Sequence, residues 1–140
     1  MRRQPDRMES KVEPNLATET KVLPILEELR RREPIFHRPE FGTTRADFEA
    51  MTEPDFWETG ASGCRYSREY VLDVLEERYR QPPEDDWETR DFHCREIAAD
   101  NYLLTYTLQQ GLRITRRATL WRRTAQGWKI VYHQGTPVTA

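Results

Sequence analysis

Residues 90–137, RDFHCREIAADNYLLTYTLQQGLRITRRATLWRRTAQGWKIVYHQGTP, decide the fold of this chain. Apolar and polar residues alternate through most of this stretch, which is typical of strands that place one face on a core. Turn residues interrupt the alternation at Asp100-Asn101, Gln110-Gly111 and Gln126-Gly127. Four strands joined by turns this short predict a continuous antiparallel meander.

Upstream of the meander, the spacing of apolar residues changes from two to three and four, as in an amphipathic helix. The stripe, which includes one carboxylate, consists of Val22, Ile25, Leu26, Leu29, Glu33 and Phe36. It predicts a helix that begins near Lys21. Pro34 lacks an amide hydrogen and clashes with the preceding turn, at a cost of ~3 kcal/mol inside a helix. The helix therefore either ends near Glu33 or kinks and continues to His37.

Two further helices and one strand are predicted between the first helix and the meander. Thr44, with Asp47 three residues later, forms a capping box that begins a short helix. In residues 55–63, DFWETGASG, a strand would place Phe56 and Glu58 on the same face, and the glycines would end it in a turn. Ser67 is a suitable N-cap for the next helix. Residues 81–86, QPPEDD, read as an acidic linker that stops this helix.

Helices followed by a long meander indicate an α+β fold with the helices on one face of the sheet. A chain of 140 residues fits one domain, and such a domain buries roughly 70% of the surface of the unfolded chain. Residues 1–19 mix charges and prolines without periodicity, so we expect a flexible extension before a single domain at 20–140.

Composition indicates a cytoplasmic protein without a nucleic-acid partner or a membrane span. The net charge of −2 leaves no basic tail, and the arginines of residues 113–123 fall on both faces of a strand, which favours a solvated sheet surface over a nucleic-acid platform. Cys64 and Cys94 stand far apart and are expected to be reduced. The chain has no apolar run of the ~20 residues that a membrane span needs, and its first residues lack the apolar stretch of a secretion signal.

The order of these elements resembles the nuclear transport factor 2-like (SnoaL-like) superfamily, and within it a bacterial branch known only as a domain of unknown function. The resemblance covers residues 21–138 and rests on three motifs: Phe-x-Glu-x-Gly at 56–60, Arg-x-Thr-x-Trp-Arg at 117–122, and the closing Gly-Trp-x-Ile strand with His133. It implies a cone-shaped, curved antiparallel sheet wrapped around N-terminal helices (a cystatin-like roll), and a homodimer joined through the sheet. It does not imply a reaction, because this fold supports many.

Glu58 is the first candidate for a catalytic side chain. It shares a strand face with Phe56, so its carboxylate should point into an apolar cavity, where burial raises a carboxyl pKa and makes a base for near-neutral pH. The alternative is a structural ion pair, for example with Arg117. His37 is the second candidate, because a helix that passed Pro34 would place it on the same face as Glu33, as a base with its orienting group. The alternative is a His in a loop before Pro39.

The remaining candidates are expected to contact a ligand. His93 and His133 alternate with apolar residues and should face the outer surface of the sheet, although the end of the last strand could return His133 and Gln134 to the cavity. The other candidate ligand contacts are Glu33, Arg117 and the aromatic residues Tyr70, Tyr106, Trp57 and Trp121. Such aromatic residues more often pack in a core, with the hydroxyl or indole N–H hydrogen-bonded.

The sequence predicts neither a metal site nor a cofactor. Its three histidines and two cysteines never reach ligand spacing such as His-x-x-x-His or Cys-x-x-Cys, and no glycine-rich phosphate loop is present. The function predicted from these residues is binding of an unidentified small organic molecule, with cofactor-independent acid–base chemistry of the isomerase, cyclase or dehydratase type. The alternative is a non-catalytic homodimeric domain for protein interaction or ligand sensing.

Overall fold

The computed structural model describes residues 12–82 and 86–139. Most of the predicted N-terminal extension, residues 1–11, and the centre of the predicted linker, residues 83–85, lie outside the described residues. Within the described part of the extension, Thr18 is attached to the sheet, because its Oγ1 accepts a hydrogen bond from the Cys94 amide at 3.2 Å.

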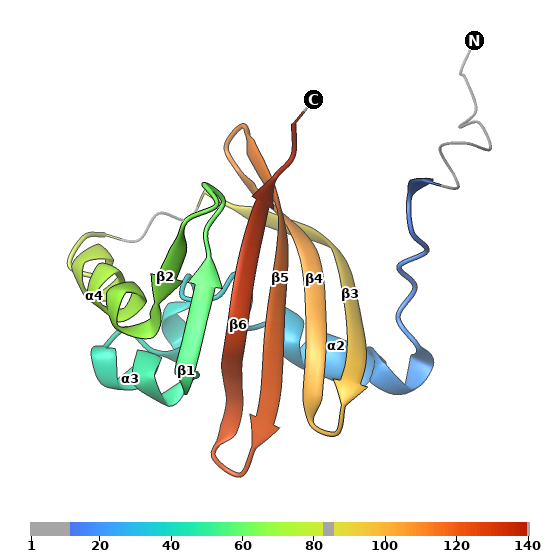
Figure 1. The fold of residues 1–140 in the computed structure, drawn as a ribbon, viewed down its shortest axis with the longest axis horizontal. Helices are drawn as coiled ribbons and strands as arrows, with labels where there is room; N and C mark the ends of the chain where they lie inside the picture. Colours follow the sequence, from blue (N-terminus) through green and yellow to red (C-terminus); the bar gives the residue numbers. More distant parts are fainter. Residues whose placement is uncertain (1–11, 83–85, 140) are drawn as a thin grey trace.

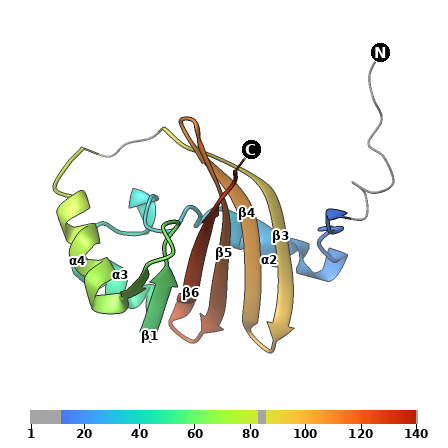
Figure 2. The same cartoon turned by 45° about the horizontal axis from the view of Figure 1, so that its top comes forward.

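A curved sheet of six strands forms the body of the molecule, in the order β2-β1-β6-β5-β4-β3 (Figures 1 and 2). The strands are β1 (Thr52–Thr59), β2 (Arg65–Ser67), β3 (Glu88–Ala98), β4 (Asn101–Gln110), β5 (Arg113–Thr124) and β6 (Gly127–Pro137). Strands β3 to β6 form the predicted meander, and an α+β fold is confirmed. The sheet is mixed rather than antiparallel throughout, because β1 joins β6 in parallel. In the sequence these two strands are separated by β2, one helix and strands β3–β5.

The helices lie on the inner face of the sheet and at one end of it. They are α2 (Leu23–Arg30), α3 (Arg45–Ala50) and α4 (Arg68–Arg78), with short 3-10 helices η1 (Thr20–Val22) and η2 (Pro39–Phe41). Figure 1 views the sheet from its outer face, with α2 behind β3–β5 and with α3 and α4 beside β1 and β2. Helix α2 ends at Arg30 and does not pass Pro34, so His37 is in a loop. Residues 60–63 form the predicted turn, but β2, which follows it, was not predicted.

The core lies between α2 and the inner face of the sheet. Leu104, Tyr106 and Trp121 are almost fully buried there, in the same cluster as Leu26 and Leu29 of α2. The strand alternation predicted these inner-face positions on β4 correctly, because successive side chains of a strand point to opposite faces.

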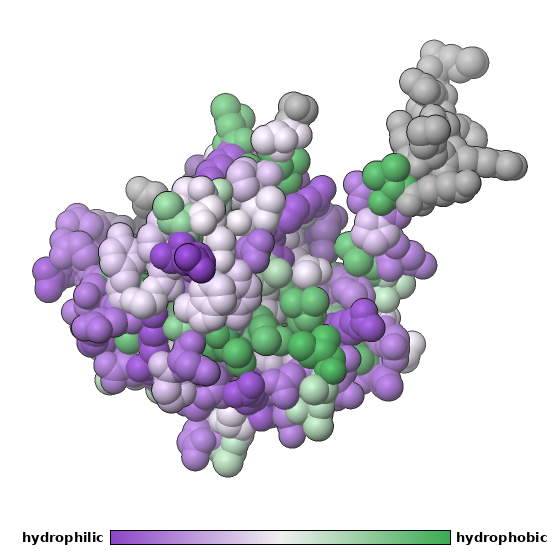
Figure 3. All heavy atoms as spheres, viewed as in Figure 1, coloured by the Kyte–Doolittle hydropathy of each residue, from purple (hydrophilic) through white to green (hydrophobic). Residues whose placement is uncertain are grey.

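A β-bulge in β6 breaks that alternation. Trp121 of β5 pairs with Ile130, but the preceding residue, Leu120, pairs with Tyr132, so Val131 is an extra residue in the strand. A bulge of this kind moves every following side chain to the opposite face. Tyr132 therefore faces outward and His133 inward, and the prediction that His133 faces the outer surface is wrong. Figure 3 shows the outer face, on which apolar side chains gather over the sheet between polar ones.

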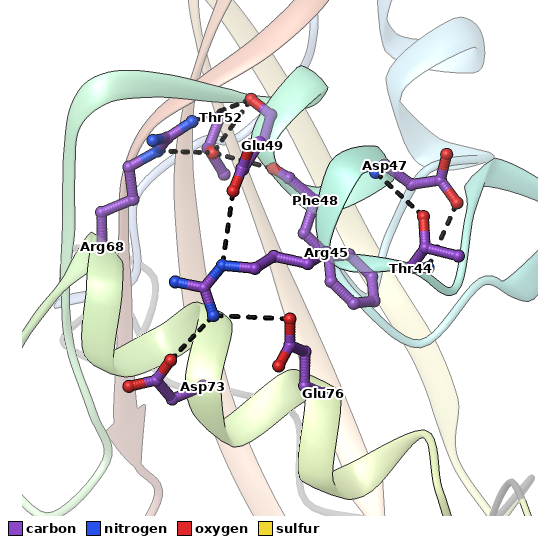
Figure 4. A network of polar contacts seen from close by, with 9 residues as sticks. All are labelled: Thr44, Arg45, Asp47, Phe48, Glu49, Thr52, Arg68, Asp73 and Glu76. Carbon is purple, nitrogen blue, oxygen red and sulfur yellow. Dashed lines mark hydrogen bonds and ion pairs between the residues drawn. The ribbon is translucent and has the colours of Figure 1, made fainter.

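Helices α3 and α4 are joined by ion pairs at the end of the sheet (Figure 4). Arg45 lies 2.7 Å from Asp73, 3.5 Å from Glu76 and 3.3 Å from Glu49. The predicted capping box of Thr44 with Asp47 is present. Ser67 caps α4 by accepting from the Tyr70 amide at 3.2 Å, as predicted. These local contacts fix the direction of α4, which forms one wall of the cavity described next.

Candidate functional site

A cavity of about 290 Å³ lies between α4, the β1–β2 hairpin and the inner face of β5 and β6. Its polar lining consists of His37, Glu58, Arg78, Arg117 and His133. Helix α4 supplies an apolar wall, and residues 35–37 close one side. Tyr70 and Val74 of α4 line this hollow and are 53% and 38% exposed, and the ring of Tyr70 stacks on that of Tyr66 with centroids 5.0 Å apart. The combination of apolar walls with a few converging polar groups is typical of a small-molecule site.

A larger hollow of about 560 Å³ adjoins this cavity and shares Phe36, His37 and Arg78 with it. It opens towards Pro82 and Trp87, and it contains neither Glu58 nor His133. The cluster of titratable side chains therefore lines the smaller cavity, and we take this cavity as the candidate site.

Glu58 points into the cavity, as its shared face with the 2% exposed Phe56 predicted. Burial raises the pKa of Glu58 above its ordinary value of 4.5, while the positive charges of Arg117 and Arg78 act in the opposite direction. No ion pair within 4.0 Å joins Glu58 to an arginine in the described part of the chain. A carboxylate that is partly desolvated and not tied to one cation is suited to take a proton near neutral pH.

The two cavity histidines are neutral at physiological pH. Burial and the nearby arginines lower the pKa of His37 to about 4 and that of His133 to about 3. The Nε2 of His37 lies 3.4 Å from an Arg78 nitrogen and that of His133 lies 3.5 Å from an Arg117 nitrogen. Because a guanidinium can only donate, each Nε2 faces it as an acceptor and the proton is placed on Nδ1. In His133 this Nδ1–H then donates to Thr119 Oγ1 at 2.8 Å.

Arg117 reaches the cavity along the inner face of β5. Its Nε donates to Thr115 Oγ1 at 2.8 Å, which fixes the plane of the guanidinium. A Cβ atom at Gly135, the cross-strand neighbour, would lie only 3.0 Å from Arg117 Cζ, so the glycine leaves room for the guanidinium to lie against β6. Burial lowers the pKa of Arg117 below its ordinary value, while its charge is retained.

Glu33 lies outside the cavity, at the centre of a buried hydrogen-bond cluster. Its Oε1 accepts from the Ile35 amide at 3.0 Å and from the Tyr106 hydroxyl at 2.7 Å, and its Oε2 accepts from Trp121 Nε1 at 3.0 Å. Thr119 also hydrogen-bonds to it. Burial raises the pKa of Glu33, against the effect of these hydrogen bonds, and raises that of Tyr106 well above 10. The carboxyl group therefore joins the loop after α2 to two strands.

The predicted Glu33–His37 pair is not formed. Helix α2 ends at Arg30, and the two side chains diverge in the loop: Glu33 turns into the core and His37 towards Arg78 in the cavity. Phe36, between them, adopts a left-handed backbone conformation (φ 67°) that is uncommon for a residue with a bulky side chain. The Tyr79 hydroxyl donates to the Phe36 carbonyl and holds this segment from α4.

The other predicted ligand contacts are divided among three places. Tyr70 lines the cavity, whereas Tyr106 and Trp121 are buried against Glu33. Trp57 and Gln134 lie on the outer face, where the tilted ring of Trp57 packs against that of Tyr132 with centroids 4.6 Å apart and Gln134 accepts from the Tyr132 hydroxyl at 2.7 Å.

The sequence analysis missed Arg78 and Tyr66, which line the cavity. A signal for Arg78 exists: it continues the stripe of Val71, Val74 and Leu75 at the next helical spacing, so it lies on the same face of α4. Tyr66 stands in β2, a strand of three residues that is too short for periodicity to reveal.

Comparison with known proteins identifies the fold. No protein-family model matches the sequence, and no curated protein matches it. A provisionally assigned dehydratase of the NTF2-like (nuclear transport factor 2-like) family from Streptomyces avermitilis superposes with a TM-score of 0.66 at 19% identity, covering 86% of this chain and 98% of its own. The chain has the NTF2-like fold. A protein of unknown function of the DUF3225 family from Pectobacterium atrosepticum superposes with a TM-score of 0.63 at 16% identity, covering 86% and 94%. A provisionally assigned ketosteroid isomerase from Parabacteroides distasonis gives 0.57 at 16% identity, covering 91% and 94%.

The NTF2-like fold agrees with the resemblance found from the sequence motifs. Because the sequence identities are below 20%, the comparison supports a shared fold and nothing beyond it. Among residues 12–82 and 86–139, no helix has the length and apolar character that crossing a membrane requires.

Replacement of Glu33 by Gln is expected to lower the free energy of unfolding by about 1–3 kcal/mol. Both carboxyl oxygens accept from N–H groups, of Ile35 and Trp121, so either orientation of an amide turns its NH₂ group towards a donor. Urea denaturation followed by Trp fluorescence measures this change. Glu28→Gln, on the exposed side of α2, is the matched control and should change the stability by less than ~0.5 kcal/mol. Equal urea denaturation midpoints for Glu33→Gln and wild type would contradict the proposal that the Glu33 hydrogen bonds stabilise the fold.

The two cavity histidines should lower the stability of the fold as the pH falls from 6.5 towards 4. His37 and His133 have folded-state pKa values of about 4 and about 3 against an ordinary value of 6.5, so in this range each of them binds more protons in the unfolded chain than in the folded chain. Glu33 and Glu58, whose pKa values are raised by burial, act in the opposite direction. Urea denaturation at a series of pH values gives the slope. His133→Gln should reduce the slope whatever its own stability, with His93→Gln on β3 as the control. Parallel pH profiles for wild type and His133→Gln would refute the assignment.

Proposed function

We propose that the cavity binds a small organic carbonyl compound and that Glu58 acts as a general base upon it. The observation that supports this proposal is the Glu58 carboxylate, which lies in an apolar-walled cavity, has a pKa raised by burial, and has two guanidinium groups nearby. A hollow site with a candidate base favours ligand binding over a filled, purely structural core. Two structural neighbours carry provisional names of the same reaction types, a dehydratase and a ketosteroid isomerase.

The proposed step is transfer of a proton from carbon to Glu58. The base takes the proton from the carbon next to the carbonyl, the electron pair of that C–H bond forms the C=C bond of an enolate, and the carbonyl oxygen becomes the oxyanion. Arg117 is the proposed group for that oxyanion, because it is a cation held in place by Thr115. His133 positions Arg117 rather than donating itself, since its Nε2 is an acceptor and its Nδ1–H is occupied by Thr119.

Glu58→Gln should slow exchange of substrate hydrogen with solvent by at least about 100-fold, because an amide cannot accept the proton. The measurement is deuterium incorporation from D₂O into a panel of carbonyl compounds, followed by proton NMR. In the wild type the rate should rise with pH through the raised pKa of Glu58 and then level off. Glu69→Gln, on the exposed first turn of α4, is the matched control. Exchange at the wild-type rate in Glu58→Gln would rule out this base.

A second proposal concerns the outer face of the sheet, which we infer to be the surface of a homodimer. Leu103, Leu120, Tyr132 and Trp57 form a cross-strand row over four neighbouring strands. Trp57 is 44% exposed although it is a large aromatic residue, and Figure 3 shows the apolar side chains of this face. An apolar row that continues across a sheet and is flanked by polar groups is typical of a surface that another subunit covers.

Leu120→Glu is expected to convert a dimer to a monomer, because it places a charge in the middle of the row, where it would be buried unpaired on association. Size-exclusion chromatography with multi-angle light scattering measures the mass of each species. Leu112→Glu is the matched control, since Leu112 is fully exposed at the β4–β5 turn, away from the row. A wild-type protein that is monomeric at all concentrations would overturn the dimer.

A further inference from the structure

The two cavity arginines lack the carboxylate partner that several other arginines of the described residues have. Arg45 lies 2.7 Å from Asp73, and Arg122 lies 3.2 Å from Glu53. Within residues 12–82 and 86–139, by contrast, neither Arg78 nor Arg117 is within 4.0 Å of a carboxylate. Arg117 Nη2 has no hydrogen-bond partner in the same residues. Both side chains therefore present unused donors to the cavity.

The charges of the cavity do not balance. Glu58 supplies one negative charge and the two guanidinium groups supply two positive charges, while His37 and His133 are neutral. Arg117 is partly buried, where a positive charge without a counter-charge is costly, and burial already lowers its pKa. Arg78 is exposed to solvent at the edge of the cavity. A bound monoanion would make the cavity neutral. A dianion such as a phosphate monoester would reverse the imbalance and be repelled by Glu58.

We infer that the ligand of this cavity is a small monocarboxylate, held by Arg117 and Arg78. The two guanidinium groups come from different elements, the inner face of β5 and the last turn of α4, and line the same hollow of about 290 Å³. A guanidinium offers two parallel N–H donors that match the two oxygens of a carboxylate. The apolar wall of Val71, Val74 and Leu75 is left for the carbon skeleton.

This inference rests on the proposed function and narrows its substrate to oxo acids. While Glu58 is ionised, the ligand carboxylate brings the site to neutrality. When Glu58 takes a proton from the ligand, the negative charge moves to the carbonyl oxygen and the total charge of the site is unchanged. The arginines thus serve both the resting carboxylate and the oxyanion, and a charge-balanced site avoids an unpaired charge at either stage.

The test uses matched pairs of an oxo acid and its primary amide, from 4-oxopentanoate to 3-phenylpyruvate, which differ in charge and hardly in shape and which all carry a C–H bond next to the ketone. Saturation-transfer NMR detects binding, and calorimetry gives the Kd of each member. The wild type should bind at least one acid about 10- to 100-fold more tightly than its amide, the range for a charge-assisted hydrogen bond. Raising the salt concentration should reduce this preference. Equal binding of acids and amides, or no binding by any pair, would overturn the inference.

Three variants of the cavity and one control variant locate the effect. Arg117→Gln and Arg78→Gln should each reduce the preference for the acid about tenfold or more, while Arg95→Gln, which removes an equal charge from the exposed part of β3, should leave it unchanged. Gly135→Ala should also reduce it, because the added methyl group displaces the Arg117 guanidinium. If Arg117→Gln fails to fold, Arg78→Gln at the exposed end of α4 decides the matter alone. An unchanged acid preference in both arginine variants would refute the site.

The same samples separate this inference from the proposed function. Deuterium incorporation into the bound acid reports Glu58 chemistry, whereas the acid-to-amide ratio of Kd values reports the arginines. Acid binding without exchange would leave the carboxylate site standing and remove the proposed reaction. Deuterium exchange into neutral ketones without any preference for acids would support the proposed reaction and remove the carboxylate site.

Discussion

The buried carboxyl group of Glu33 is the interaction on which the rest of the structure depends. It accepts hydrogen bonds from the Ile35 amide, the Tyr106 hydroxyl and the Trp121 indole, from a loop and two neighbouring strands. A carboxyl group in a core is costly unless each oxygen is satisfied, so all these groups must be in place together. This requirement joins the loop after α2 to the sheet at a single position. It thereby also fixes the position of residues 34–36, which follow Glu33 in the loop.

The positions of several polar side chains in the cavity depend on this hydrogen-bond cluster. Thr119 links Glu33 to His133, and His133 in turn lies beside Arg117, so a line of polar contacts runs from the core to the cavity wall. On the other side, the residues after Glu33 carry His37 to Arg78. The groups that face the ligand space are therefore held by contacts behind them, which is the condition for a preorganised site. Glu58 is the exception, since it depends on the strand face of β1 alone.

Much of the fold could be predicted from local patterns. The meander, the Thr44 and Ser67 caps and the inward face of Glu58 all follow from spacing and turn chemistry, which act within a few residues. His133 could not be placed in this way. The bulge at Val131 depends on pairing with β5, and the extra residue inverts the faces of the strand that follows. The alternation of side chains along one strand does not reveal how that strand pairs with its neighbour.

The sequence by itself determined the class of fold, the order of its elements and one inward-facing carboxylate, because amphipathic periods and caps are local properties of the chain. Only the tertiary structure decided that Glu33 belongs to the core and not to a catalytic pair, that His133 faces inward, and that Arg78 and Arg117 meet across one cavity. The physical reason is that these facts depend on which strands and helices pack together. A site assembled from α4, β1, β5 and β6 exists only after these elements have packed together.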